Sequence, residues 1–260
     1  MRTLLYNSLK ILILLLAFSA CSVSSKISKK EGHYNYAVDS LLDFYSQRDT
    51  SFLNTIESYK SQLDGEMGEL ISIADEPMIA HKPESKLSNY IADAMLSIGR
   101  DFCVSNGLSH SVDFAIMNIG GIRSGMPKGE INTGKLFEML PFKNKLVILG
   151  MKGKNVLDLL NQLAQRNGEG ISGVKMGIKE GSVVDVLVQG KTIDPDKVYY
   201  VISVDYLTDG GGGVSAFAHR ETYRHLHKKL REEIIKYISD KYKKGEHISA
   251  ELDGRIYHVE

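Results

Sequence analysis

One short segment of the sequence gathers residue types that could hold a ligand. Residues 117–123 read MNIGGIR, directly after a predicted apolar strand over 113–117. Asn118 can donate and accept hydrogen bonds at once, and Arg123 can bind a phosphate or carboxylate through two nitrogen atoms. Gly120 and Gly121 would let main-chain N–H groups approach a ligand, because no Cβ stands in the way. The alternative is that Arg123 only pairs with a surface carboxylate.

Two aromatic residues occupy comparable positions further along the chain. Phe142 lies in LPFKN, and Tyr206 lies in VDYLTDGGGG, where a second predicted strand ends in a glycine-rich loop. Ligands in mixed α/β sheets commonly bind at strand ends. Two rings on separate loops could therefore stack on a flat base, an interaction of about 1–3 kcal/mol per base. The alternative is that both rings are core residues and residues 210–213 form a loop without a ligand.

The composition limits the classes of partner. The chain has 260 residues, 43% of them apolar, which is enough for one main domain with a sizeable core. Its 32 basic and 32 acidic side chains give a formal net charge of zero, and the sequence pI is about 7.1. No overall field attracts a polyanion, so we expect no nucleic-acid partner.

Hydrophobic spacing predicts interleaved helices and strands. One or two helices are expected within residues 36–71, as the start of a helical lead-in over residues 36–77. The predicted strands within residues 174–206 follow one another closely, as in hairpins, which argues against a wholly parallel sheet. We therefore predict an α+β fold with mixed β-sheets flanked by helices. Further helices are predicted at 87–106, within 132–140, at 155–165 and at about 222–241, and strands at 113–117, 145–151, 174–179, 183–188 and 198–206.

The first residues of the sequence have the layout of an export signal. Basic residues are followed by an apolar run over 11–18 and then by Ser-Ala-Cys at 19–21. This ending resembles a bacterial lipoprotein signal over residues 1–21, with Cys21 lipidated and residues 22–35 as a tether. The expected location is the cell envelope, with the chain anchored to a membrane, periplasm-facing or on the outer membrane. An ordinary cleaved signal and an uncleaved anchor are the alternatives. Cys103, the other cysteine, is expected to be a packed small hydrophobe.

Several motifs together resemble the carboxy-terminal domain of the bacterial 5'-nucleotidase and UDP-sugar hydrolase family. They are NYIADAM, the MNIGGIRSGMPKGEI run, LFEMLPFKN, the ISG at 171–173 and VYYVISVDYLTDGGGG. The resemblance covers residues 78–260 in the family's order and spacing. It implies a domain of mixed sheets and helices that binds the nucleoside part of a nucleotide. Phe142 and Tyr206 would then stack on the base, and the polar wall would be formed by Asn118, Gly120, Gly121 and Arg123.

Two positions depart from the pattern of that family. The family's glycine loop usually reads Gly-Gly-Asp-Gly, with the aspartate on the ribose hydroxyls, and here that position is Gly212. Asp205 and Asp209 are the nearby carboxylates, but neither aligns with that role. Arginines that the family often carries before its Glu-Ser-x-Leu segment are replaced by His81 and Lys82.

Of the metal-binding elements of that family, the sequence contains one at most. The resemblance places hydrolysis in a two-metal domain with Asp-x-His, Asn-His and His-x-His elements, and only His225-Leu226-His227 is present. In the predicted helix over 222–241 these histidines would point to different faces. We expect no catalytic residue, metal or other cofactor in this chain, with divalent metals only on a partner metallophosphatase. We therefore predict the nucleoside-recognising half of a split 5'-nucleotidase, with a non-catalytic lipoprotein that binds nucleosides or nucleotide sugars as the alternative. The missing metal ligands argue against a third function, that of a self-sufficient hydrolase.

The anchor prediction can be tested at the mature amino terminus. If Ser-Ala-Cys is a lipoprotein cleavage site, the mature chain begins at a lipidated Cys21 and partitions into detergent. Cys21→Ala should release the chain or leave the precursor uncleaved. Mass spectrometry that finds an unmodified mature terminus at another residue would contradict the prediction.

Overall fold

The structure is a computed structural model that describes residues 50–260, with side chains from Ile56 onward. Contacts divide the chain into residues 1–54 and residues 55–260, and the elements that follow α3 all belong to the second unit. The predicted signal, Cys21 and the tether lie outside the described residues. Within the described part, no helix is long and apolar enough to cross a membrane.

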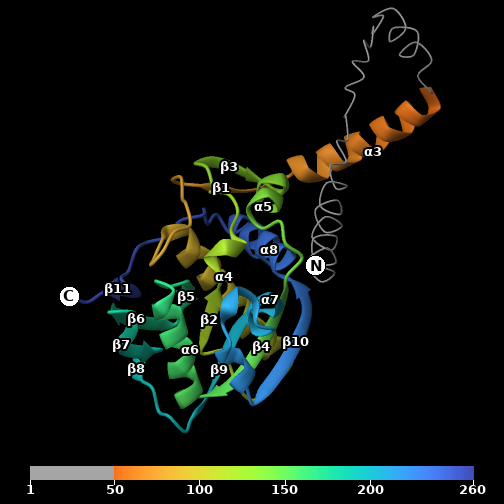
Figure 1. Ribbon diagram of the computed structural model, residues 1–260. Helices are drawn as coiled ribbons and strands as arrows, with labels where there is room; N and C mark the ends of the chain where they lie inside the picture. The colour runs from red at the N-terminus through yellow and green to blue at the C-terminus, as the bar shows by residue number, and fades with distance from the viewer. Residues whose placement is uncertain (1–49) are drawn as a thin grey trace, which may run out of the picture. The chain divides into compact units, whose positions relative to one another are not determined.

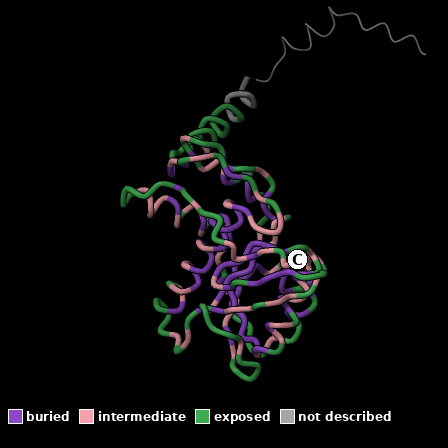
Figure 2. The backbone as a smooth tube through the Cα atoms, turned by 90° about the vertical axis from the view of Figure 1, so that its left-hand side faces the viewer, coloured by how far each residue is buried: buried purple, intermediate pink, exposed green. Residues whose placement is uncertain are grey.

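A five-stranded mixed sheet forms the centre of the domain (Figure 1). Its strand order is β10-β4-β9-β2-β5, in which β2 and β9 run parallel and the other pairs are antiparallel. The middle strands are apolar on both faces, and Figure 2 shows their backbone as buried. The strands are β2 (Phe114–Met117), β4 (Lys145–Lys152), β5 (Gly170–Ser172), β9 (Val198–Val204) and β10 (Thr222–Lys229).

The remaining strands form two smaller sheets. In the first, a hairpin of β6 (Val174–Lys179) and β7 (Ser182–Val188) is extended by β8 (Lys191–Thr192) and by β11 (Ile256–His258), which pairs parallel to β6. In the second, β1 (Leu70–Ala74) pairs antiparallel with β3 (Gly129–Asn132). The predicted hairpin block therefore divides between two sheets, because β9 enters the central one. The predicted mixed architecture is confirmed.

The helices pack their apolar faces against the sheets. Helix α4 (Lys86–Ser105) begins at a capping box, in which the side chain of Ser85 accepts from Ser88 N, and its buried face packs on β2 and β5. Cys103 on α4 is 1% exposed, as predicted for a packed residue, and burial raises the pKa of its thiol. Helix α6 packs on β7, and α8 packs on α4 and β1. The remaining bounds are α3 (Thr50–Gly68), α5 (Thr133–Met139), α6 (Gly153–Gln165), α7 (Asp205–Thr208) and α8 (Leu230–Tyr242).

Two predicted segments differ in the structure. The lead-in helix is present as α3, but residues 70–74, expected in a helical region, form β1 and belong with the domain's strands. The predicted helix over 222–241 is wrong in its first part, because residues 222–229 form β10 on the edge of the central sheet. Pairing with β4 supplies the backbone hydrogen bonds that a helix would otherwise have made. Only the part from Leu230 onward is helical.

The start of α6 requires a glycine. Gly153 N donates to Lys197 O at 2.9 Å, and a methyl group on Gly153 would lie only 2.0 Å from Asp194 O. We expect Gly153→Ala to lower the free energy of unfolding by about 1–3 kcal/mol, measured by urea denaturation. Gly65→Ala is the matched control: open space surrounds this position in α3, so the same change should be neutral or stabilising by up to about 1 kcal/mol. Equal stability of the two variants would contradict the packing argument.

Candidate functional site

The loop after β2 folds into a tight turn that keeps the Asn118 side chain close to the backbone. Residues Ile119–Gly121 form a short 3-10 turn, closed by a hydrogen bond from Gly121 N to Asn118 O at 2.9 Å. A methyl group on Gly121 would lie 2.6 Å from Met117 Cε and 3.1 Å from Asn118 Oδ1. Gly121 thus serves close packing inside the loop. The Oδ1 atom of Asn118 is buried and has no hydrogen-bond partner among the described residues.

The loop that carries Phe142 is held by a buried arginine. Arg231 of α8 is 7% exposed and donates to Leu140 O at 2.9 Å and to Pro141 O at 3.1 Å. Its guanidinium lies 3.7 Å from the centre of the Phe137 ring. These contacts fix the backbone before Phe142, whose ring stays 48% exposed. Phe142 is therefore not a core residue.

The second ring is supported by the glycine loop that follows it. Tyr206 in α7 is 49% exposed, and its hydroxyl accepts from Gly212 N at 3.1 Å. A methyl group on Gly211 would lie 2.2 Å from Tyr206 O, so the loop can return over the tyrosine only as glycine. Gly212 has a φ of 64°, in the left-handed region that favours glycine. The Tyr206 ring is also outside the core, so the alternative that both rings are core residues is wrong.

Neither aspartate near the glycine loop, Asp205 or Asp209, lies at position 212. The Asp205 carboxylate accepts from Lys145 N at 3.0 Å and from Tyr206 N at 2.8 Å, so it links β4 to the start of α7. Asp209 is exposed at the end of α7. Neither replaces a carboxylate at position 212.

One cavity of about 290 Å³ joins the two loops. Five of the seven predicted binding residues line it, whereas Gly121 is packed inside its turn and Arg123 is exposed beside it, donating to Gly120 O at 3.3 Å. Two larger cavities, of about 530 and 490 Å³, lie elsewhere among charged surface side chains and contain neither ring. The residues that line the smaller cavity are Asn118, Gly120, Phe142, Asn144, Arg166, Glu169, Tyr206 and Gly212.

Sequence reasoning missed the ionic cluster in the cavity wall. Glu169 is 4% exposed, and its carboxylate accepts from Ile119 N at 2.7 Å and from Lys82 Nζ at 2.8 Å. Lys82 also donates to Arg166 O at 2.8 Å, and Arg166 Nε lies 3.6 Å from the same carboxylate. In the sequence, RNGEG at 166–170 has only the signal of a helix end and turn. Asn144, also missed, follows Phe142 by two residues.

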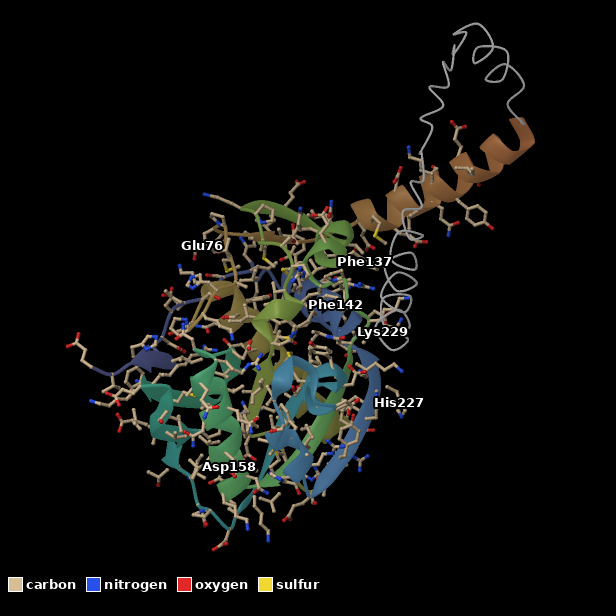
Figure 3. The ribbon with its side chains drawn as sticks, in the orientation of Figure 1. Glu76, Phe137, Phe142, Asp158, His227 and Lys229 are labelled. Carbon is tan, nitrogen blue, oxygen red and sulfur yellow. The ribbon has the colours of Figure 1, made fainter. Side chains whose placement is uncertain are left out.

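The histidine pair forms no metal centre with neighbouring groups. On the bulged strand β10 the rings of His225 and His227 stack at 4.8 Å, and His227 N donates to His225 Nδ1 at 3.1 Å. Figure 3 shows His227 on the outer edge of the sheet. Within residues 56–260, no group of three or more histidine, cysteine, aspartate or glutamate side chains could hold a metal ion. The described residues therefore do not fit a two-metal centre.

The family model and the relatives that match this chain point to the same family. Residues 69–219 match the family model of the 5'-nucleotidase C-terminal domain, which is more than half of the chain. A cell wall protein of Listeria monocytogenes, Lmo0130, is 28% identical over 92% of this chain, and a 5'-nucleotidase of Vibrio vulnificus is 29% identical over 64% of it. These matches span only 33% and 30% of the relatives, so the chain corresponds to about a third of their length.

A solved structure agrees with the sequence comparison. The crystal structure of a 5'-nucleotidase precursor from Thermus thermophilus superposes with a TM-score of 0.65 and 28% sequence identity. The match covers 81% of this chain and 43% of that protein. The mixed sheets and flanking helices are thus an architecture that this solved relative shares.

The Glu169 cluster can be tested by removing its carboxylate. Glu169→Ala leaves Ile119 N without its acceptor and Lys82 Nζ with only the carbonyl of Arg166, so we expect the free energy of unfolding to fall by about 1–3 kcal/mol. The matched control is Glu138→Ala, which removes an exposed partner of Lys135 and should cost about 0–1 kcal/mol. Denaturant titration of both variants measures the difference. A Glu169 variant as stable as the Glu138 variant would show that the cluster does not hold the loops together.

Proposed function

The chain belongs to the 5'-nucleotidase C-terminal domain family, and from this premise we propose that its cavity binds the nucleoside part of a nucleotide. The observation that carries the proposal is the pair of half-exposed rings, Phe142 and Tyr206, on two separately anchored loops of one cavity. Apolar rings in such positions are not needed for the core. They suit stacking on a base, which presents two flat apolar faces.

The size and the polar groups of the cavity support a small ligand. Its volume is close to the lower end of small-molecule sites, roughly 300 Å³. Asn118 and Asn144 line it and can each donate and accept hydrogen bonds, as the edge of a base requires. We propose that Arg123, exposed beside Gly120, contacts the 5'-phosphate outside the cavity.

For catalysis we propose that this domain positions the substrate while a separate metallophosphatase polypeptide supplies the hydrolytic metal centre. Two metal ions would activate the attacking water and stabilise the leaving oxygen. The described residues of this chain do not fit such a centre, and Asp-x-His and Asn-His elements are missing from its sequence. The contribution of this domain is orientation of the substrate, which can account for a large part of a rate enhancement. A lipid anchor at Cys21 would keep the complex in the cell envelope.

A second candidate is a non-catalytic lipoprotein that binds nucleosides or nucleotide sugars. The two rings and the two asparagines that would contact a base all line one cavity of this chain, and this arrangement favours binding as a function in its own right. The two candidates differ only in whether a metallophosphatase uses the bound ligand.

Ligand binding tests both candidates at once. Phe142→Ala and Tyr206→Ala should each weaken the binding of 5'-AMP by about 1–3 kcal/mol, measured by calorimetry, because each removes one stacking face. Tyr223→Ala is the matched control, since this ring is also partly exposed but lies on β10 outside the cavity. It should leave the affinity unchanged. If no nucleoside, nucleotide or nucleotide sugar binds at millimolar concentration, both candidates are wrong.

Reconstitution separates the two candidates. The purified chain alone should release no phosphate from AMP or UDP-glucose, and adding a single-domain metallophosphatase from the same cell should produce activity. Phe142→Ala should then impair hydrolysis of the nucleotide but not of a simple aryl phosphate, which has no base to stack. Chelator-sensitive turnover by the chain alone would overturn the proposed division of labour.

A further inference from the structure

Arg166 lies against the glycine loop of the cavity. It caps the end of α6, and a methyl group on Gly212 would lie 3.3 Å from Arg166 Nη2, while one on Gly213 would lie 3.4 Å from Nη1. The guanidinium therefore extends across the loop on its cavity side, where Arg166 and Gly212 are both lining residues. A side chain at Gly212 would compete for the space that the guanidinium uses.

No described residue accepts a hydrogen bond from the terminal nitrogen atoms of Arg166. Its Nε is buried without a hydrogen-bond partner, and neither Nη atom donates a hydrogen bond to a residue in the described range 56–260. Glu169 is the nearest carboxylate, but it accepts from Lys82 at 2.8 Å and lies 3.6 Å from Arg166 Nε. Lys82 and Arg166 each carry a positive charge and Glu169 carries one negative charge, so this cluster has a net charge of +1.

The polar wall of the cavity thus offers hydrogen-bond donors and lacks an available carboxylate. A carboxylate beside a ribose accepts hydrogen bonds from its hydroxyl groups, whereas an arginine in that place accommodates a phosphate on the sugar. A guanidinium has five donors and no acceptor, and it binds an oxyanion through two parallel hydrogen bonds. The chemistry of Arg166 therefore favours an oxyanion over a free hydroxyl.

The oxyanion that would bind Arg166 differs from the 5'-phosphate that would be hydrolysed. The 5'-phosphate must be reachable for a metal centre outside this cavity and is assigned above to Arg123, whereas Arg166, whose side chain is 34% exposed, lines the cavity beside Gly212. Arg166 lines the same cavity of about 290 Å³ as the two rings, so a nucleoside whose base stacked on the rings would bring its sugar toward the guanidinium. Resting on the proposed nucleoside binding, we propose that Arg166 makes this cavity selective for nucleosides that carry a phosphate on the 2'- or 3'-oxygen.

Calorimetry on the full chain with adenosine, 5'-AMP, 2'-AMP and 3'-AMP tests the proposal. We expect 2'-AMP or 3'-AMP to bind about tenfold or more tightly than adenosine, as for a charge-assisted hydrogen-bond pair. Arg166→Met should remove this gain, so that 2'-AMP and 3'-AMP bind this variant no more tightly than adenosine does, while Lys82 still pairs with Glu169. Arg224→Met removes an equal charge from exposed β10, outside the cavity, and should keep the gain.

A second variant leaves Arg166 in place. Gly212→Asp puts a carboxylate beside Nη2, at a left-handed position that aspartate tolerates better than most residues, and should abolish the preference for the added phosphate. The inference is overturned if adenosine binds without a gain from the 2'- or 3'-phosphate, or if the gain survives in Arg166→Met. It is also overturned if Arg166→Met weakens only 5'-AMP. If adenosine itself does not bind, the proposed nucleoside site fails, and the inference fails with it.

Discussion

The buried carboxylate of Glu169 joins three segments that lie far apart in the sequence, and the geometry of the cavity depends on their meeting there. A carboxylate that is 4% exposed must be paired and hydrogen-bonded, because an isolated charge is costly to bury. Lys82 from the loop before α4 and the main-chain N–H of Ile119 after β2 meet this requirement, while Arg166 follows α6 in the same wall. The loop that carries Asn118 is therefore fixed by electrostatics as well as by its own turn.

Arg231 performs the corresponding task for the aromatic loop. Both clusters use a charged side chain to bind main-chain atoms next to the residue of interest, so the functional side chain itself remains accessible. Phe142 is about half exposed although the carbonyl groups before it are held by a buried guanidinium, and Tyr206 is tied to Gly212 through its hydroxyl. Rings that are ordered before a ligand arrives lose less conformational entropy on binding. This arrangement explains how exposed aromatic residues can form a defined site.

The sequence predicted those parts of the fold and site that depend on local pattern or motif. Helix α4 and strand β4 follow from apolar spacing, and the motifs located both rings. The sequence predicts helix where β10 forms, because YRHLHKK has no strand-like alternation of apolar residues and the pairing of β10 with β4 is a tertiary contact. The Glu169 cluster could not be predicted for a similar reason. Its hydrogen bonds to Ile119 and Lys82 cross 50 and 87 residues, and RNGEG has no feature beyond a turn.

On the proposed function, the position of the cavity explains how this domain can influence a hydrolytic reaction whose metal centre lies on another polypeptide. Interactions with a part of the substrate that does not react raise the rate only when they fix the reacting group in a productive geometry. A rigid ring pair and a rigid polar wall satisfy this condition on the side of the nucleoside, whereas freely moving rings would mainly increase ground-state affinity. On the proposed function, the anchoring of the loops by Glu169 and Arg231 is therefore as important for turnover as the contacts that the rings make with the base.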